Sequence, residues 1–335
     1  QVPSTVPAGS TSLTVWCLWG LDLPTIAALD ASHMASALHR VSQQLIELVS
    51  TLGSWSGRAF NLCLVTRDAV TTTRQSGARP GRRSSILGSI LWGAGRSLRH
   101  EHPAWQLSLV DIEAADATTA ARILFEEANC DERAAEAAWR TGTNGPERLT
   151  LRLRSFPLET HDHAPPGLGG TWVITGGLGQ LGLHLAQWLT DRGVKHLLLL
   201  GRRAPQEAAA SRFREWAERD VKVISAPVDI TDFAALQSCL EALPGDWPDV
   251  LSIVHAAGVL DDALLHQQSP ARVADVLAPK VLGGWNLHKL SLAKPVEHFV
   301  LFSSATGLLG NPGQAAYGGA NHFLDALADY RASAN

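Results

Sequence analysis

Three glycines near the middle of the chain have the spacing of a phosphate-binding loop. Gly177, Gly179 and Gly182 form the pattern G-x-G-x-x-G. They follow an apolar run at residues 172–174, which predicts a buried strand, and precede a helix with apolar positions along one side. Glycines in such a turn let the backbone approach a pyrophosphate at the positive end of the helix. The motif alone is weak, but strand, loop, helix and second strand in this order predict a dinucleotide site.

The end of the second strand, residues 197–200, indicates which dinucleotide binds. An acidic residue there, about 20 residues past the glycines, would favour NAD through its ribose hydroxyl. This chain has Arg202 and Arg203 at that point. A guanidinium can grip the extra phosphate of NADP in a fork. We therefore expect NADPH, with two solvated arginines at a strand end as the alternative.

Two later strand ends complete the expected cofactor site. Asp229 follows a strand at 221–226, where its carboxylate can accept a hydrogen bond from an adenine amino group; helix capping is the alternative, more so for Thr231 and Asp232. A strand at 250–254 leads into small residues that let a cofactor pass over the sheet edge. The residues expected at the cofactor are Thr175, Gly176, Gly177, Leu178, Gly179, Gln180, Leu181, Gly182, Arg202, Arg203, Asp229, Ile230, Ala256, Ala257 and Gly258.

Three further side chains could reduce a ketone with such a cofactor. Reduction needs a hydride donor and a proton donor at the developing alkoxide. A tyrosine can give the proton when a nearby lysine lowers its pKa from about 10, and a serine hydroxyl can stabilise charge on the substrate oxygen. Ser304 directly follows a strand predicted at 298–303, Tyr317 precedes a helix predicted at 320–330, and Lys280 lies in a helix predicted at 273–290. Each residue alone is weak evidence for catalysis, because a single tyrosine near the start of a helix usually only packs against its neighbours. The order of the three residues along the chain favours a joint role.

The first half of the chain predicts a second α/β unit that has no glycine-rich phosphate loop. Strands are expected at 14–19, 61–66, 106–110 and 149–153, and helices at 32–52, 86–99 and 118–127. Strands that alternate with helices predict a parallel sheet. A basic loop at 71–85 could bind an anion, although a solvated loop is the favoured interpretation. We expect a structural subdomain at 1–160, a Pro- and Gly-rich linker at 161–170 and a catalytic subdomain at 171–335.

The composition excludes several classes of protein. A net charge of −4 over 335 residues gives no reason to expect nucleic acid or a membrane as partner. The cysteines are far apart without metal-ligand spacing, which predicts reduced packing residues in a cytoplasmic protein; they are Cys17, Cys63, Cys130 and Cys239. His161 and His163 flank an acid, but no further ligands gather nearby, so no metal is expected.

The second half resembles the catalytic subdomain of a polyketide synthase ketoreductase, a relative of the short-chain dehydrogenases. The matching segments are TGGLGQLG, LLGRR, VDITD, HAAGVLDD, LAPKVLGGWNL, FVLFSSATG and PGQAAYGGAN. The first half resembles the structural subdomain of the same family through VWCLWGLD and ILWGAGRSLRHEHPAWQLSLVDIE. The resemblance implies Tyr317 as proton donor, Ser304 as carbonyl binder, and Lys280 and Asn321 completing a tetrad. Common short-chain dehydrogenases carry lysine four residues after the tyrosine; here Asn321 stands there and Lys280 takes over from another helix.

The resemblance also implies a substrate, partners and a stereochemical outcome. We expect reduction of a β-ketoacyl thioester carried by an acyl carrier protein, within a larger synthase, by a domain that is monomeric when isolated. The run Leu260-Asp261-Asp262 resembles the fingerprint of B-type ketoreductases, which give the D-configured β-hydroxyl. Leu309 stands where A-type enzymes carry tryptophan, and Pro312 suits the B-type pattern. Ala316 departs from the asparagine often found before the tyrosine.

The expected fold class is α/β with two Rossmann-like subdomains, a truncated structural one and a doubly wound NADPH-binding catalytic one. The resemblance implies that such domains continue past the equivalent of Asn335 into a strand, a substrate-covering lid and a last strand, and without these we expect weak or no activity. Two other functions stay open. An NADP-linked epimerase would normally keep Tyr and Lys four residues apart, which Asn321 argues against. A non-catalytic domain should have lost Tyr317, Ser304 or the glycines, and this chain has all of them.

Overall fold

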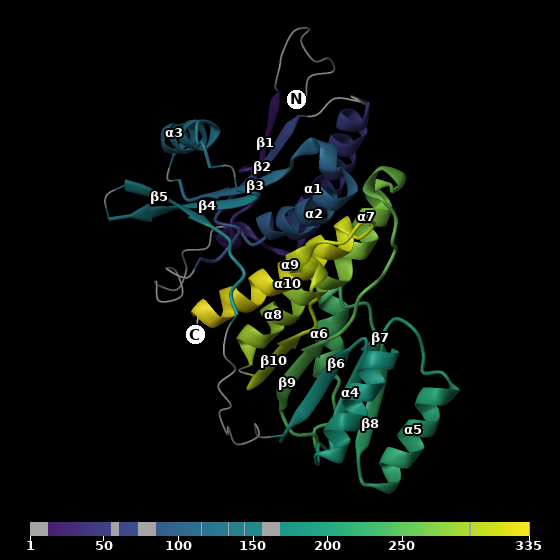
Figure 1. The fold of residues 1–335 in the computed structure, drawn as a ribbon. Helices are drawn as coiled ribbons and strands as arrows, with labels where there is room; N and C mark the ends of the chain where they lie inside the picture. Colours follow the sequence, from purple (N-terminus) through teal and green to yellow (C-terminus); the bar gives the residue numbers. More distant parts are fainter. Residues whose placement is uncertain are drawn as a thin grey trace. The chain divides into compact units, whose positions relative to one another are not determined.

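The computed structural model describes residues 13–54, 60–72, 85–114, 116–132, 134–143, 145–155, 168–294 and 296–334. The chain forms two compact units, each with its own five-stranded sheet (Figure 1). Unit 1 consists of Gln1–Leu153, Leu260–Leu277 and Ser303–Asn335, and unit 2 of Arg154–Val259 and Ala278–Phe302. Two C-terminal segments thus group with the N-terminal sheet. The linker predicted at 161–170 lies largely outside the described residues, and the division into structural and catalytic subdomains stays a prediction about function.

The sheet of unit 1 is mixed. Its order is β1-β2-β3-β4-β5, and β5 runs antiparallel to β4 while the other neighbours are parallel. The fully parallel sheet predicted for this half is therefore wrong at its last strand. β5 begins at Gly145, directly after β4 ends at Gly142, and parallel neighbours need a crossover of about a dozen residues or more. The predicted strand at 149–153 ends earlier, at Thr150, and β4 was not predicted. The strands are Thr14–Gly20, Asn61–Arg67, Ser108–Ile112, Glu136–Gly142 and Gly145–Thr150.

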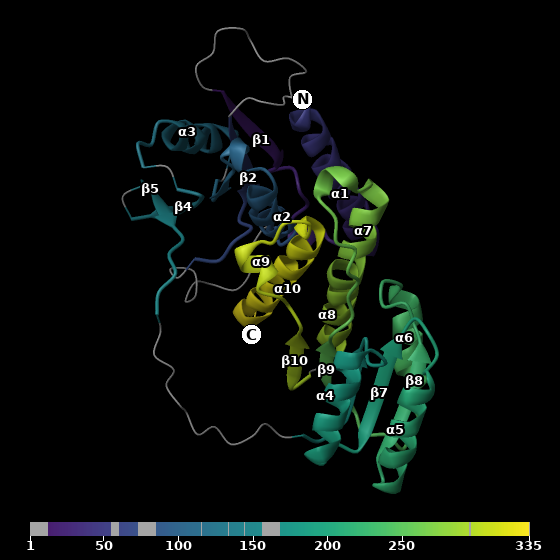
Figure 2. The ribbon, with the colours of Figure 1, turned by 45° about the vertical axis from the view of Figure 1, so that its right-hand side comes forward.

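Helices cover both faces of this sheet. α3 packs Ile123 against Val65 and Trp139 on one face. α2 approaches the side chains of Leu64 and Leu109, which point to the other face because strand side chains alternate. The helices α2, α9 and α10 contact one another, as Figure 2 shows. The helices of unit 1 are α1 (Ala31–Gly53), α2 (Gly88–Glu101), α3 (Ala117–Ala128), α7 (Pro270–Ala278), α9 (Thr306–Leu309) and α10 (Ala315–Ala334).

Two glycines let α2 and α10 approach closely. A Cβ built on Gly93 would lie 2.2 Å from the carbonyl oxygen of Gly318, and one built on Gly318 would lie 2.9 Å from the carbonyl oxygen of Gly93. No side chain larger than hydrogen fits between these backbones. Because Gly318 follows Tyr317, this contact fixes the helix turn that carries the expected proton donor.

Unit 2 is a doubly wound parallel sheet. Its order is β10-β9-β6-β7-β8. Leu189 of α4 and Trp216 of α5 pack on one face, and Leu236 of α6 and Leu287 of α8 pack on the other. The strands are β6 (Thr171–Thr175), β7 (His196–Gly201), β8 (Lys222–Pro227), β9 (Val250–His255) and β10 (His298–Leu301); the helices are α4 (Gln180–Asp191), α5 (Glu207–Glu218), α6 (Phe233–Glu241) and α8 (Gly284–Ala293). The predicted α/β, Rossmann-like fold class is confirmed.

The helix predicted at 273–290 is present and longer, at 270–293, and it contains a π-helical turn. α7 ends at Ala278, a π-helical turn occupies Pro279–Gly283, and α8 begins at Gly284. Proline has no N–H for the α-helical ladder, and the wider π-helical turn begins at Pro279. The helix predicted at 320–330 begins five residues earlier, at Ala315. Among the described residues, no helix has the length and apolar character needed to cross a membrane.

Candidate active site

The glycine-rich turn lies between β6, near the middle of the unit 2 sheet, and the first turn of α4. Gly176 has a φ of 68°, a conformation that other residues rarely adopt. A Cβ on Gly182 would lie 2.3 Å from the carbonyl oxygen of Gly176 and 2.6 Å from the Cα of Gly177. Gly179 is the N-cap of α4 and carries no side-chain cap, so the first amides of the helix stay available to a ligand. This cradle fits a pyrophosphate.

The other expected cofactor residues lie at the same edge of this sheet. The parallel registers pair Thr175 with both Leu200 and His255, so the carboxyl ends of β6, β7 and β9 meet. The order of strands reverses between β6 and β9, which is where open α/β sheets bind their ligands. Arg202 and Arg203 follow β7 and are exposed. Two guanidinium groups beside a pyrophosphate cradle suit a phosphorylated dinucleotide.

Asp229 has local partners as well as an exposed position. Its Oδ1 accepts hydrogen bonds from the backbone N–H of Thr231 (2.9 Å) and from its hydroxyl (2.8 Å). The capping alternative holds for Asp232, whose carboxylate accepts from Ala235 at the start of α6. Ile230 is buried, and its carbonyl oxygen accepts a hydrogen bond from Asn286. The adenine contact of Asp229 stays a prediction.

Sequence reasoning missed a buried histidine at the end of β9. His255 is fully buried, and its Nδ1 lies 2.7 Å from the hydroxyl of Thr175. Burial, with the nearby Lys280 cation adding to it, lowers the pKa of His255 to about 3. The ring is therefore neutral at physiological pH. The contact between His255 and Thr175 connects the carboxyl end of β9, before Ala256, to the carboxyl end of β6, before the glycine-rich turn.

Lys280 lies in the π-helical turn of unit 2. It is 4% exposed, and its Nζ donates a 2.7 Å hydrogen bond to the carbonyl oxygen of Phe302. A Cβ on Gly258 would lie 3.1 Å from the Cε of Lys280, so the small residue after β9 leaves room for the lysine stem. π-Helical turns occur frequently at functional sites. The turn presents the ammonium group at the end of β10.

Unit 1 brings three other members of the expected tetrad into one region. Tyr317 lies in the first turn of α10, and Asn321, one turn later, donates from Nδ2 to the carbonyl oxygen of Tyr317 across 2.7 Å. The carbonyl oxygen of Asn321 accepts a 3.1 Å hydrogen bond from the hydroxyl of Ser303. Ser304 follows directly and its Oγ accepts from the N–H of Thr306 (3.2 Å). Asn321 thus joins the turn of Tyr317 to the segment of Ser304.

The expected stereocontrol residues form two segments in unit 1, which we call the LDD segment (residues 260–265) and the Pro312 loop (residues 309–314). Leu260 and Leu309 are both more than half exposed. The adjacent carboxylates have different partners. Asp261 accepts 2.7 and 2.5 Å hydrogen bonds from Arg272, which lower its pKa below the ordinary range. Asp262 accepts one of 2.8 Å from Gln314 in the Pro312 loop.

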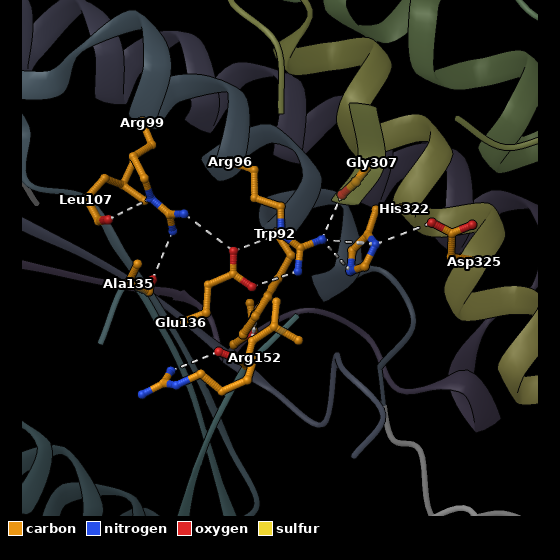
Figure 3. Close-up of polar contacts among 12 residues, drawn as sticks. Trp92, Arg96, Arg99, Leu107, Ala135, Glu136, Arg152, Gly307, His322 and Asp325 are labelled. Carbon is orange, nitrogen blue, oxygen red and sulfur yellow. Dashed lines mark hydrogen bonds and ion pairs between the residues drawn. The ribbon is translucent and has the colours of Figure 1, made fainter. Parts of the chain in front are cut away.

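A buried arginine from α2 supports the turn that follows Ser304 (Figure 3). Arg96 donates from Nη1 to the carbonyl oxygen of Gly307 (2.7 Å), and forms a two-bonded pair with Glu136 of β4 (3.0 and 2.8 Å). The ring of His322 lies 3.4 Å from the same Nη1 and 3.5 Å from the carboxylate of Asp325. Burial lowers the pKa of His322, and the charge of Arg96 lowers it further against the opposing effect of Asp325.

The cysteines form no disulfide, and the described residues include no cluster of metal ligands. All four cysteines are free thiols, and burial raises the pKa of Cys17 and of Cys63 to about 12. In the parts of the chain that the structure describes, no three His, Cys, Asp or Glu side chains gather as a metal site. His161 and His163 lie outside those parts, as do the arginines at 74, 79, 82 and 83 of the basic loop.

The doubly wound sheet and the glycine cradle define a Rossmann-type dinucleotide fold, and comparison with known proteins specifies it. Residues 170–335 match the model of the KR domain family. The chain is 36% identical over 296 residues to "Polyketide synthase GfsA" of Streptomyces halstedii, and 41% identical over 168 residues to "Spectinabilin polyketide synthase system protein NorB" of Streptomyces orinoci. These matches cover 85% and 49% of this chain but only 4% and 8% of those much longer proteins.

Solved structures give the same result for the fold. "Structure of A-type Ketoreductases from Modular Polyketide Synthase" aligns with a TM-score of 0.73 and 29% identity, over 91% of this chain and 69% of that one. "The first ketoreductase of the tylosin PKS" aligns with a TM-score of 0.67 and 26% identity, over 96% and 76%. Residues 170–335 are therefore similar to the KR domain family, and the chain has the fold of ketoreductases of known structure.

Proposed function

We propose that this chain catalyses the NADPH-dependent reduction of a β-ketoacyl thioester, carried by an acyl carrier protein, to the β-hydroxyacyl product during polyketide chain elongation. The observation that carries the proposal is the hydrogen-bonded arrangement of Ser303-Ser304, Tyr317 and Asn321 in unit 1. Asn321 donates to the backbone carbonyl oxygen of Tyr317, and Ser303 donates to that of Asn321, so the segment of Ser304 and the turn of Tyr317 are held together. Other domains of a synthase and the carrier protein are its proposed partners, and the scattered free thiols favour a cytoplasmic location.

The residues proposed to hold NADPH are those of the glycine cradle, with Arg202 and Arg203 at the phosphate that distinguishes NADPH from NADH. When bound, the nicotinamide supplies the hydride. Tyr317 donates the proton to the substrate oxygen, Ser304 binds that oxygen and stabilises its charge, and Lys280 and Asn321 complete the tetrad. These roles follow from the family resemblance and the residue chemistry.

We propose further that the product has the D configuration, as in B-type ketoreductases. The support is Leu260-Asp261-Asp262, together with Leu309 and Pro312 in place of the A-type pattern. The solved relative with the TM-score of 0.73 is described as A-type, so chirality needs a direct measurement. Chiral chromatography of the reduced thioester decides it: an L-configured product would contradict the B-type assignment while leaving the reductase activity intact.

A non-catalytic, structural role within the synthase is the second candidate. Reduction is tested with the natural polypeptide that carries this sequence, a β-ketoacyl thioester of N-acetylcysteamine and NADPH. If the wild type oxidises NADPH and the Tyr317→Phe variant does not, the result supports the reductase function. Tight NADPH binding with no turnover would favour the structural role.

A further inference from the structure

Glu101, the last residue of α2, holds both segments that carry the expected stereocontrol residues. One carboxylate oxygen accepts a 2.9 Å hydrogen bond from the backbone N–H of Leu265, at the end of the LDD segment. The other accepts a 3.0 Å hydrogen bond from the backbone N–H of Gly313, in the Pro312 loop. These partners are 164 and 212 residues away in sequence. A single side chain from the N-terminal half therefore connects two distant segments.

The position of this carboxylate is electrostatically unfavourable for the helix itself. The C-terminal end of a helix carries partial negative charge, so a glutamate there is repelled by the unpaired carbonyl groups. Burial also raises the pKa of Glu101, against the opposing effect of the two backbone hydrogen bonds and of His266. Helix stability alone thus gives no reason for an acid at this point. The two N–H groups that it binds do.

The last turns of α2 make further contacts with the Pro312 loop. The hydroxyl of Ser97 accepts from the N–H of Asn311 (3.2 Å), and Nε2 of His100 lies 3.1 Å from the carbonyl oxygen of Leu309. Of these residues, Glu101 is the one that also binds the LDD segment. The two segments meet directly as well, since the N–H of Ala263 donates to the carbonyl oxygen of Gly313 (3.0 Å).

We propose that Glu101 is a positioning residue that sets the configuration of the product by holding the LDD segment and the Pro312 loop at a fixed separation. The inference rests on the proposed reductase function. Both carboxylate oxygens accept from backbone N–H groups, so Glu101 acts through these segments and not on the substrate. The expected stereocontrol residues lie close to the two N–H groups that Glu101 binds. Leu265 follows Leu260, Asp261 and Asp262 by three to five residues, and Gly313 directly follows Pro312. Loosening either hydrogen bond therefore shifts the residues that are expected to choose which face of the ketone is reduced.

The test compares Glu101→Ala, Glu101→Gln and the wild type in the natural polypeptide that carries this sequence. Product enantiomers are separated after reduction of a β-ketoacyl thioester, and amide hydrogen exchange is followed in residues 260–265 and 309–314. We expect Glu101→Ala to lower the ratio of major to minor enantiomer roughly tenfold or more, because it removes two hydrogen bonds to a charged group. Glu101→Gln keeps one acceptor oxygen and should give an intermediate ratio. Exchange in both segments should become faster in the same order.

Glu127→Gln is the matched control, because Glu127 is also a two-partner glutamate of unit 1, bound to Trp139 and Arg148 of β4 and β5. Its enantiomer ratio should equal that of the wild type. Unchanged ratios in folded Glu101 variants, with the wild type active, overturn the inference and leave the proposed function standing. A wild type that binds NADPH but never reduces the thioester contradicts the proposed function and this inference together. If Glu101→Ala does not fold, the Glu101→Gln ratio decides.

Discussion

Arg96 of α2 donates a 2.7 Å hydrogen bond to the carbonyl oxygen of Gly307, three residues after Ser304. The same guanidinium binds Glu136 through two bonds, and both side chains of this pair are at most 8% exposed. Burial raises the pKa of Glu136, but the hydrogen bonds and charges of Arg96 and Arg99 outweigh it and bring the pKa below its ordinary value. The turn after Ser304 is therefore held by Arg96, whose own position depends on its ion pair with Glu136 of β4.

Removing this arginine should destabilise unit 1 strongly. Arg96→Met leaves the Glu136 carboxylate buried without its main partner, and breaking such a pair costs about 3 kcal/mol or more. The double variant Arg96→Met, Glu136→Leu should recover much of that loss. Urea unfolding measures the free energy of unfolding of the single and the double variant. Arg122→Ala, which breaks an exposed pair with Glu126, is the control and should change the free energy of unfolding by less than about 1 kcal/mol. An equal effect of Arg96→Met and Arg122→Ala would contradict the importance of the buried pair.

The close approach of α2 and α10 predicts a severe effect of one methyl group. Gly93→Ala places a Cβ 2.2 Å from the carbonyl oxygen of Gly318, so the two helices must separate at the turn of Tyr317. We expect a loss of about 1–3 kcal/mol in the free energy of unfolding and a lower kcat. Gly53→Ala, at the end of α1 with no atom within 4 Å of the new Cβ, should be neutral or slightly stabilising. Equal thermal midpoints of the two variants would refute this packing argument.

Cofactor choice should depend on the two arginines after β7. We expect Arg202→Ala combined with Arg203→Ala to lower kcat/KM for NADPH by about tenfold or more, because charge-assisted hydrogen bonds to the extra phosphate are lost. The value for NADH should barely change. Arg192→Ala, an exposed arginine stacked on Trp188 of α4, serves as the control. A similar loss with both cofactors would assign these arginines to general charge attraction.

His255 should make unit 2 sensitive to acid. Its pKa is about 3 in the folded chain and 6.5 ordinarily, so between these values the unfolded chain binds a proton that the folded chain does not. The free energy of unfolding contributed by this group is fully present above pH 6.5 and falls as the pH drops toward 3. Urea unfolding at several pH values should show a shallower acid loss for His255→Gln than for the wild type, and no such change for His39→Asn at the exposed surface of α1. Parallel slopes for His255→Gln and the wild type would mean that His255 is not buried as a neutral ring.

Local sequence pattern predicted unit 2 well because its strands are short apolar runs with clear borders. Leu197 to Leu200 form the interior of β7 and are fully buried on both faces, as parallel strands require. The same reasoning missed β4, whose sequence Glu-Ala-Ala-Trp-Arg has polar ends and alanines that favour helix. Its burial comes from β3 and from Arg96, which lies 40 residues earlier in the chain.

The candidate site was predictable only where the signal was local. The glycine loop, Ser304 and Tyr317 carry short motifs. Pro279 could have indicated the irregular, π-helical turn that holds Lys280. Glu101 could not be found in this way, because its partners are two backbone amides that only the folded chain brings near it.

The central claim is tested most directly by the absorbance of NADPH during incubation with a β-ketoacyl thioester, for the natural polypeptide that carries this sequence (the wild type) and for its Tyr317→Phe variant. The account predicts steady oxidation by the wild type and a loss of at least about a hundredfold in Tyr317→Phe, with NADPH affinity unchanged in a fluorescence titration. Equal rates in the two proteins would contradict the assignment of Tyr317 as the proton donor.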